Sequence, residues 1–191
     1  MHQQLWFPTP IWAEDLNIDL APLVKFTYEL QAKDSGRKVS NTKGWQSSAL
    51  VFDEHKELAP LKNALLVKAK ECVKDYGFLS DPIINSCWIN LNQENCYNIS
   101  HIHNTFLSGV FYIKATKNSG LVKFTRNFTD QYILELHRPY KENILNCAEC
   151  GYDPVAGRLI LFPSWLVHYV EPNTDKEDRI SIAFNINLTK K

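Results

Sequence analysis

The sequence lacks an excess of charge of either sign. Its 191 residues hold 21 Lys and Arg against 21 Asp and Glu, so the formal net charge is zero. No basic block or stripe interrupts this balance, and nucleic acid is therefore disfavoured as the main partner. The chain also lacks an apolar run long enough for a membrane span, so we expect no membrane partner.

The N-terminus lacks a basic start followed by an apolar stretch, and no internal repeat, low-complexity tract or linker follows. A secretory signal is therefore not expected. Five cysteines form an odd set, which without a signal predicts reduced thiols in a cytoplasmic compartment. The length suits one core. We expect residues 1–191 to form a single domain, with helical support over 1–80 and a barrel core over 83–188.

Helical periodicity belongs to the first third of the chain. Pro22 begins one stretch in which Leu23 and Thr27 recur at helical spacing. A clearer helix is predicted from about 57 to 76, and Gly77 is placed to end it. Such a helix has one apolar stripe, which needs a sheet to cover.

From residue 83 onward, short β-rich runs separated by turn signals dominate the sequence. Seven runs are expected as strands: 83–91, 107–115, 121–125, 132–136, 158–162, 165–170 and 179–188. No stretch of helical length lies between them, which disfavours parallel βαβ winding. The pattern predicts a mainly β fold with flanking helices, as a sandwich or jelly roll of antiparallel strands.

Two histidines two residues apart, His101 and His103, suggest the chemistry of the chain. Side chains two apart on a strand point to the same face, so these imidazoles are expected to aim together. His168 lies beside Trp165 and Leu166, where burial is expected, and a buried histidine needs partners. Three imidazoles converging inside a barrel would bind a redox-active divalent metal. The alternative for the first two is a surface pair without a metal.

A clean alternation of polar and apolar residues begins at Arg179, which shares its strand face with Ser181. A guanidinium and a hydroxyl on one interior face suit a dicarboxylate, because the guanidinium can grip a carboxylate with two parallel bonds. The alternative is an arginine at a strand start that pairs on the surface with Asp175, Glu177 or Asp178.

An earlier strand repeats this arrangement with two amides, Asn90 and Asn92, on the face that also carries Trp88. Near a metal, these amides could bind an oxo-acid or a substrate. They fit equally well as polar residues of an edge strand that face water.

The order of these motifs resembles the 2-oxoglutarate/iron(II) oxygenase superfamily. In that pattern a histidine and a ligand two residues later open the barrel, a distal histidine follows, and an arginine with a serine two further on binds the oxo-acid. The corresponding residues here are His101, His103, His168, Arg179 and Ser181. More narrowly, the chain is similar to a small group of 2-oxoglutarate oxygenases of bacteria and phages. The matching segments are 5–12, 44–47, 88–90, 101–104, 107–112, 157–168 and 179–185.

The resemblance implies a double-stranded β-helix, a jelly-roll barrel of the kind that cupins also have. It implies an oxidoreductase that binds Fe(II) through His101, His103 and His168 and uses 2-oxoglutarate and O₂. The implied activity is that of a dioxygenase, here a hydroxylase, which couples oxidative decarboxylation of 2-oxoglutarate to oxidation of a substrate.

The resemblance also implies which residues bind the co-substrate. Arg179 and Ser181 would hold the distal carboxylate of 2-oxoglutarate, and Asn90 and Asn92 are further cofactor-binding candidates. Tyr112 lies near the expected site, where it could bond the oxo-acid or pack through its ring.

Position 103 departs from the wider superfamily, whose second ligand is Asp or Glu. With His103 as a ligand, the site has three neutral imidazoles and is one unit more positive, which should tighten anion binding. The alternative places His103 outside the ligand set, with another residue completing the site.

Other classes stay open at this stage. They are a cupin-like three-histidine metal protein or dioxygenase that does not use 2-oxoglutarate, and a non-catalytic binding barrel. Cys147 and Cys150 form a CxxC pair, but no second pair supplies the four ligands of a structural zinc site. Trp45 and Arg126 are candidate substrate contacts. Small-molecule, peptide and protein substrates all fit, and so does a homodimer.

Overall fold

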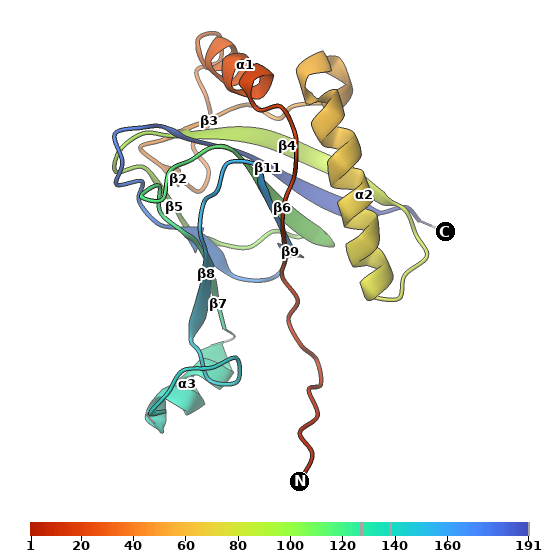
Figure 1. Cartoon of the computed structure of the whole chain (residues 1–191), viewed down its shortest axis with the longest axis vertical. Coiled ribbons are helices and arrows are strands. Elements are labelled where there is room, and N and C mark those ends of the chain that lie inside the picture. The colour runs from red at the N-terminus through yellow and green to blue at the C-terminus, as the bar shows by residue number, and fades with distance from the viewer. Residues whose placement is uncertain (127, 138, 191) are drawn as a thin grey trace.

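Two antiparallel sheets face each other in the computed structural model, which describes residues 1–126, 128–137 and 139–190 (Figure 1). The six-stranded sheet has the order β1-β9-β6-β11-β4-β3, and the five-stranded sheet has the order β2-β5-β10-β7-β8. Neighbours in each sheet are far apart in sequence, as in β1 beside β9. Pairing of β1 with β9 thus joins the beginning of the chain to its C-terminal half.

The strands of the large sheet are β1 (Trp12–Asp15), β3 (Trp45–Gln46), β4 (Pro82–Asn92), β6 (Leu107–Lys114), β9 (Arg158–Pro163) and β11 (Arg179–Leu188). Those of the small sheet are β2 (Asn41–Thr42), β5 (Tyr97–His101), β7 (Val122–Thr125), β8 (Glu149–Tyr152) and β10 (His168–Val170). The α-helices are α1 (Ala21–Gln31), α2 (Ala59–Asp75) and α3 (Phe128–Leu136), and short 3₁₀ turns span Phe52–Glu54 and Lys56–Leu58.

Strand β11 lies at the centre of the large sheet, between β4 and β6. Its alternation separates two environments, because successive side chains of a strand point to opposite faces. Ile182 and Phe184 are fully buried in the core under the helices. Arg179 and Ser181 turn instead to the space between the sheets, where both line a cavity. The predicted sidedness of this strand is confirmed.

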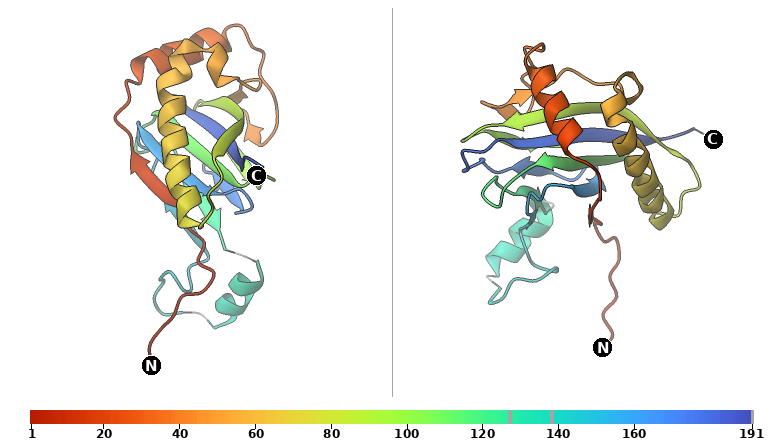
Figure 2. Two further views of the ribbon diagram at one scale, coloured as in Figure 1. Left: turned by 90° about the vertical axis from the view of Figure 1, so that its right-hand side faces the viewer. Right: turned by 45° about the horizontal axis from the view of Figure 1, so that its top comes forward.

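Helices α1 and α2 cover one face of the large sheet (Figure 2). On α2, Leu61, Leu65 and Ala69 recur at steps of four and are fully buried. Pro22 stands in the first turn of α1, where its missing N–H costs no hydrogen bond. Both predicted helices are confirmed, and they leave the opposite face of the sheet to the cavity.

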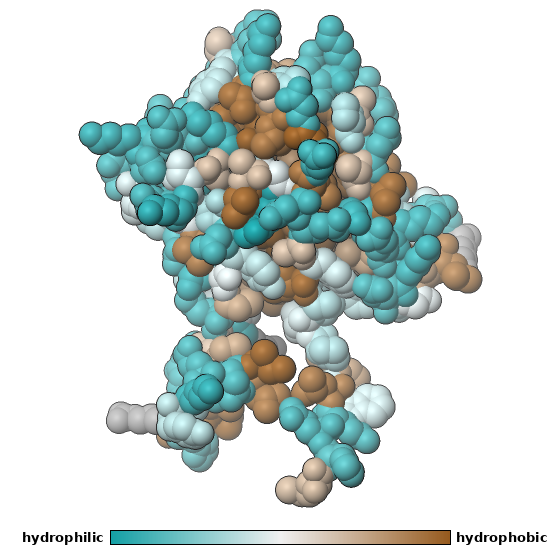
Figure 3. Space-filling model, in the orientation of Figure 1, coloured by the Kyte–Doolittle hydropathy of each residue, from teal (hydrophilic) through white to brown (hydrophobic). Residues whose placement is uncertain are grey.

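The prediction of a strand over 132–136 is wrong, because these residues belong to α3. Phe128, Tyr132 and Leu136 are spaced by four residues, and the rings of Phe128 and Tyr132 stack with centroids 6.4 Å apart. The aromatic and β-branched composition of the segment favoured a strand, but the spacing suits a helix. A helix therefore does separate β7 from β8. It projects away from both sheets, none of its described residues is buried, and apolar side chains show on its surface (Figure 3).

Short strands account for the other differences from the sequence-based expectation. Strand β10 begins at His168, since the preceding residues 164–167 form a turn. Strands β1, β2, β3 and β8 were not expected, and β5 ends at His101 instead of continuing through His103. Three of them lie within residues 1–80, so this region adds strands to the sheets as well as helices. Within the described ranges, none of the helices has the length and apolar character needed to span a lipid bilayer.

The packing between β6, β9 and β11 gives a test of the core. A Cβ at Gly109 would lie 2.7 Å from Cε2 of Phe184 and 2.8 Å from Cδ2 of Leu161. Both neighbours are buried, so neither ring nor methyl can move without disturbing the core. We expect Gly109→Ala to lower the free energy of unfolding by about 1–3 kcal/mol, measured by urea denaturation.

Gly151→Ala is the matched control, because its new Cβ would lie 2.8 Å from Cδ of the flexible Lys123 side chain at an exposed position. We expect a change below about 0.5 kcal/mol there. Equal losses in the two variants would contradict the tight packing around Gly109.

Candidate metal centre

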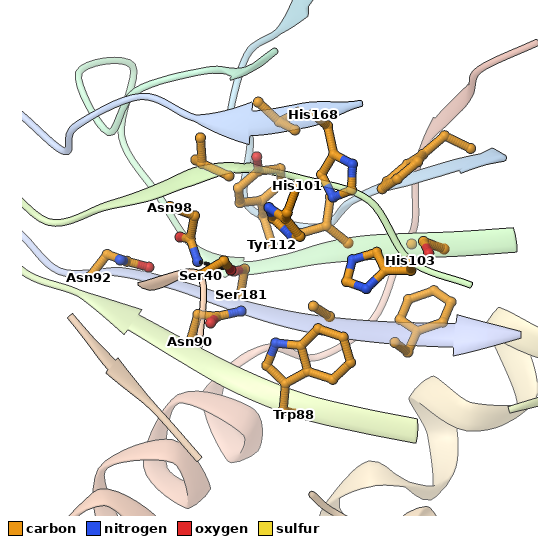
Figure 4. A pocket seen from close by; sticks show the side chains of 18 of the residues that line it. Ser40, Trp88, Asn90, Asn92, Asn98, His101, His103, Tyr112, His168 and Ser181 are labelled. Atoms are coloured by element: carbon orange, nitrogen blue, oxygen red, sulfur yellow. Dashed lines mark hydrogen bonds between the residues drawn. The ribbon is translucent and has the colours of Figure 1, made fainter. Parts of the chain in front are cut away.

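Three histidines converge between the two sheets (Figure 4). His101 ends β5, and His168 begins β10 directly opposite it in the strand register. His103 follows two residues beyond β5. One ring nitrogen of each residue lies within 4.8 Å of the other two. The predicted convergence of these three residues is therefore observed.

The backbone that positions His103 in the cluster is a loop, which differs from the expected strand. Strand alternation was expected to align it with His101, but β5 ends at His101 and His103 lies in the loop that follows. The backbone N–H of His103 donates to the carbonyl of Ser164 at 2.8 Å. Ile102, between the two histidines, is 56% exposed. A hydrogen bond to a distant turn, rather than sheet pairing, thus directs the third ring.

Two of the rings are oriented by backbone carbonyls. Nδ1 of His101 lies 2.7 Å from the carbonyl oxygen of Ile99, and Nδ1 of His168 lies 2.8 Å from that of Leu166. Because a carbonyl only accepts, each Nδ1 carries the proton and each Nε2 keeps a free lone pair. Metal-binding histidines are held in this way, since the second bond sets the tautomer and the direction of the ring.

Burial keeps the cluster neutral. Loss of hydration lowers the pKa of His168 to about 3, with a smaller contribution from the neighbouring imidazoles. The ring of Phe162 packs 4.7 Å from that of His168 and contributes to this dry environment. Burial likewise lowers the pKa of His103 to about 4 and also lowers that of His101. At neutral pH all three imidazoles can therefore donate a lone pair to a metal.

Arg179 is buried, with 1% of its surface exposed. Its Nη1 donates to the carbonyl of Ser119, to that of Glu171 at 3.0 Å and to that of Gly120 at 3.4 Å. Its Nη2 is buried and has no partner among the described residues. A buried cation with an unused donor is costly unless a ligand supplies the missing acceptor.

The alternative of a surface ion pair for Arg179 is wrong. Asp175 accepts from the hydroxyl of Thr116 at 2.7 Å, and Glu177 accepts from Nζ of Lys114 at 2.7 Å. Across the described ranges, Arg179 forms no ion pair. Its charge is therefore left for a ligand in the cavity.

The two amides of β4 add to this binding surface. Asn92 lies opposite Arg179 in the strand register and is 1% exposed. Its Nδ2, like Nη2 of Arg179, is a buried donor without a partner among the described residues, and Oδ1 of Asn90 is an unpartnered acceptor. All three residues line the same cavity as the histidines. The edge-strand alternative is excluded, because β4 lies between β3 and β11. The unused donors suit a carboxylate.

The remaining candidates divide into two groups. Ser181 and Tyr112 line the cavity, and burial raises the pKa of Tyr112 to about 12, so its phenol stays protonated. Trp45 and Arg126 are not among the residues that line the cavity. Nε1 of Trp45 donates to the carbonyl of Asp34 at 2.9 Å, and Nε of Arg126 donates to that of Cys147 at 2.8 Å.

Sequence reasoning missed several residues that line the cavity, among them Ser40, Asn98 and Trp88. Nδ2 of Asn98 donates to Oγ of Ser40 at 3.2 Å. Strand β2 has two residues, and β5 pairs with β10 through an irregular register, so neither shows a readable period. Trp88 carried a signal, because it shares a strand face with Asn90. Its ring lies 5.8 Å from that of His103.

The zinc alternative for the CxxC pair finds no support in the described part of the chain. The group of side chains placed to hold a metal there is the histidine cluster, which contains no cysteine. Cys150 is exposed and Cys147 is half-buried, and both are free thiols.

A double-stranded β-helix with a partly buried histidine cluster and a buried, unpaired guanidinium defines a metal-dependent enzyme that binds an organic acid. The family model described as "Putative 2OG-Fe(II) oxygenase" matches residues 86–185, and the chain belongs to this family. The protein is therefore an Fe(II)- and 2-oxoglutarate-dependent dioxygenase, which uses O₂ to oxidise a substrate. The predicted cofactors are confirmed, and the cupin-like and non-catalytic alternatives are set aside.

Solved structures share the fold. A Pseudomonas putida prolyl-4-hydroxylase is 13% identical, with 95% of this chain and 94% of that chain covered and a TM-score of 0.64. The α-ketoglutarate-dependent epimerase SnoN is 12% identical, with 93% and 77% covered and a TM-score of 0.70. HygX from Streptomyces hygroscopicus, with nickel and 2-oxoglutarate bound, is 10% identical, with 95% and 84% covered and a TM-score of 0.64. No curated protein matches the sequence.

The lowered histidine pKa values predict how acid affects the metal-free protein. Unfolded histidine binds a proton with a pKa near 6.5, whereas folded His103 and His168, with pKa values of about 4 and about 3, stay neutral. The unfolded state therefore binds more protons once the pH falls below about 6.5, and stability is lost down to about pH 3, where folded His168 is itself protonated. We expect the urea midpoint of the metal-free protein to fall across this window.

His103→Gln removes one of these groups and should reduce the loss, while His2→Gln, at an exposed position, should keep the wild-type pH dependence. A pH dependence in His103→Gln as steep as that of the wild type would contradict the neutral, buried state of His103.

Proposed function

We propose that His101, His103 and His168 bind Fe(II), that Arg179 and Ser181 bind the distal carboxylate of 2-oxoglutarate, and that the reaction is a hydroxylation. The observation that carries this proposal is the buried Nη2 of Arg179, which has no partner among the described residues and lines the same cavity as the three imidazoles.

The anchoring of Arg179 supports its role. Three backbone carbonyls, those of Ser119, Gly120 and Glu171, accept from Nη1 and fix the plane of the guanidinium. Nη2 is left over, and a carboxylate is the acceptor that fits a guanidinium best. Nδ2 of Asn92 is a second unused donor on the facing strand. We assign it to the same oxo-acid, together with Asn90 and the protonated phenol of Tyr112.

The charge of the cavity supports a dianionic co-substrate. Among the described residues that line it, none is acidic, and Arg179 is cationic. Three neutral imidazoles would leave the full charge of a divalent metal uncompensated. Between the two sheets, where the effective dielectric constant is below that of bulk water, such charges attract an anion strongly. The two carboxylates of 2-oxoglutarate would supply this negative charge, because the described lining residues include no acidic side chain.

When bound, Fe(II) and 2-oxoglutarate supply O₂ activation and the oxidation of a substrate C–H bond. The chain holds the ligands neutral, orients the oxo-acid and lines part of the cavity with the apolar side chains of Val110 and Phe162. Hydroxylation is the reaction named for the prolyl-4-hydroxylase that shares this fold, and we adopt it as the proposed outcome. We also propose that residues 1–191 act as one domain and that the enzyme is cytoplasmic, which the free cysteines support.

Arg179→Lys tests the assignment of the oxo-acid site. A lysine keeps the charge but cannot both hold the carbonyls and grip a carboxylate, so we expect 2-oxoglutarate affinity to fall at least about 30-fold. Fe(II) affinity should stay within about threefold, because the guanidinium is not a ligand. Anaerobic titration of the metal-loaded protein measures both affinities, and succinate release under O₂ measures turnover.

Arg158→Lys is the matched control, because Arg158 pairs with Asp15 at a half-buried site outside the cavity. It should leave 2-oxoglutarate binding unchanged. Wild-type affinity in Arg179→Lys would remove the basis of the proposed site.

His103→Asp tests the charge of the metal centre. A carboxylate at this position still binds a metal but lowers the local charge by one unit. We therefore expect 2-oxoglutarate to bind the metal-loaded variant at least about tenfold more weakly. His103→Asn, which lacks the added charge, separates this effect from a poorer ligand. Equal or tighter binding in His103→Asp would show that His103 does not set the charge of the site.

A further inference from the structure

Ser164 is fully buried in the turn between β9 and β10, four residues before His168. Its carbonyl accepts from the N–H of His103 at 2.8 Å, and its own N–H donates to the carbonyl of Phe106 at 3.4 Å. Both polar groups of its backbone are thus committed to the loop that carries the third histidine of the cluster.

The hydroxyl of Ser164 is the centre of a buried chain of hydrogen bonds. Ser108 donates to Oδ1 of Asn185 at 2.7 Å, an atom that only accepts, so the single hydroxyl proton of Ser108 is used there. The 2.7 Å contact between Ser164 and Ser108 therefore has Ser164 as donor. Oγ of Ser164 also lies 2.6 Å from Oγ1 of Thr105, whose single proton is shared between Ser164 and the carbonyl of Leu107 at 3.2 Å. Beyond them, Nδ2 of Asn185 donates to Ser86 at 3.0 Å.

Every polar group of Ser164 is engaged in a hydrogen bond. Its carbonyl, N–H and hydroxyl all contact residues within 103–108. It therefore joins the segment that carries His103 to the segment that leads into His168. These two segments are about sixty residues apart in sequence and meet at this point.

The three imidazoles differ in how their rings are supported. Those of His101 and His168 are each oriented by a backbone carbonyl through Nδ1. Among the described residues, the ring of His103 has no such bond and packs beside Trp88 with centroids 5.8 Å apart. Because His103 also lies beyond the end of β5, its position depends on the backbone of 103–108.

We propose that Ser164 is a positioning residue that holds His103 at ligand distance, so that the metal centre has three imidazoles rather than two. This inference rests on the proposed metal-binding role of the three histidines. Ser164 does not touch the metal or the substrate in this role; it acts through the backbone of His103 and through Thr105 and Ser108.

Metal affinity of the protein, measured without turnover, tests the inference. Co(II) is titrated into metal-free protein under anaerobic conditions, and binding is followed by tryptophan fluorescence, for which Trp88 lies next to the site, and by visible absorption. We expect Ser164→Ala to weaken Co(II) binding about 10- to 100-fold, the range for residues that support metal ligands. A cooperative urea transition establishes that the variant is folded.

Ser86→Ala is the matched control, because it removes a hydroxyl at the far end of the same chain and leaves every bond of Ser164 in place. Its Co(II) affinity should stay within about threefold of the wild type. An equal loss in both variants would mean that the chain acts only through general stability, which overturns the proposal.

A double substitution separates positioning from packing. If Ser164 acts through His103, adding Ser164→Ala to His103→Ala should weaken Co(II) binding no further. The same fold-change on both backgrounds would overturn the proposal. Normal binding by the wild type with unchanged affinity in Ser164→Ala would overturn this inference alone. A wild-type protein that takes up no metal would overturn it together with the proposed function.

Discussion

The burial of the Arg179 cation without a carboxylate partner is the constraint on which the cavity depends. Removing a charge from water is costly, and backbone carbonyls offset only part of that cost. The nearby acids Asp175 and Glu177 are occupied by Thr116 and Lys114. The protein therefore keeps a positive charge in a cavity whose other described lining residues are neutral, an arrangement that favours binding of an anion.

The histidine cluster adds no negative charge that would neutralise the Arg179 guanidinium. A cluster that included a carboxylate would compensate the metal from within the protein. Here burial lowers the pKa of His168 to about 3 and keeps the imidazoles neutral, and in the proposed function the co-substrate supplies the compensating charge. The same low-polarity surroundings that make the arginine costly to bury thus also prepare the ligands to bind.

The parts of the fold and site that could be predicted from sequence are those with a regular period. Strand β11 alternates strictly, so the inward positions of Arg179 and Ser181 were readable, as were the helices with steps of three and four. The prediction that His103 joins the cluster was right, but its reasoning was wrong. A backbone hydrogen bond from His103 to Ser164 positions the residue, whereas the prediction relied on strand alternation. Such a contact joins distant residues and leaves no local signal. Helix α3 was missed because its composition suggested one structure and its spacing another.

Helix α3 can change in sequence more freely than the barrel. None of its described residues is buried, and it projects from the end of β7, which carries no ligand (Figure 1). Exposed substitutions away from the core change stability little. The segment can therefore acquire new side chains while the barrel keeps its packing, which makes it a place where descendants of this protein could gain new binding preferences.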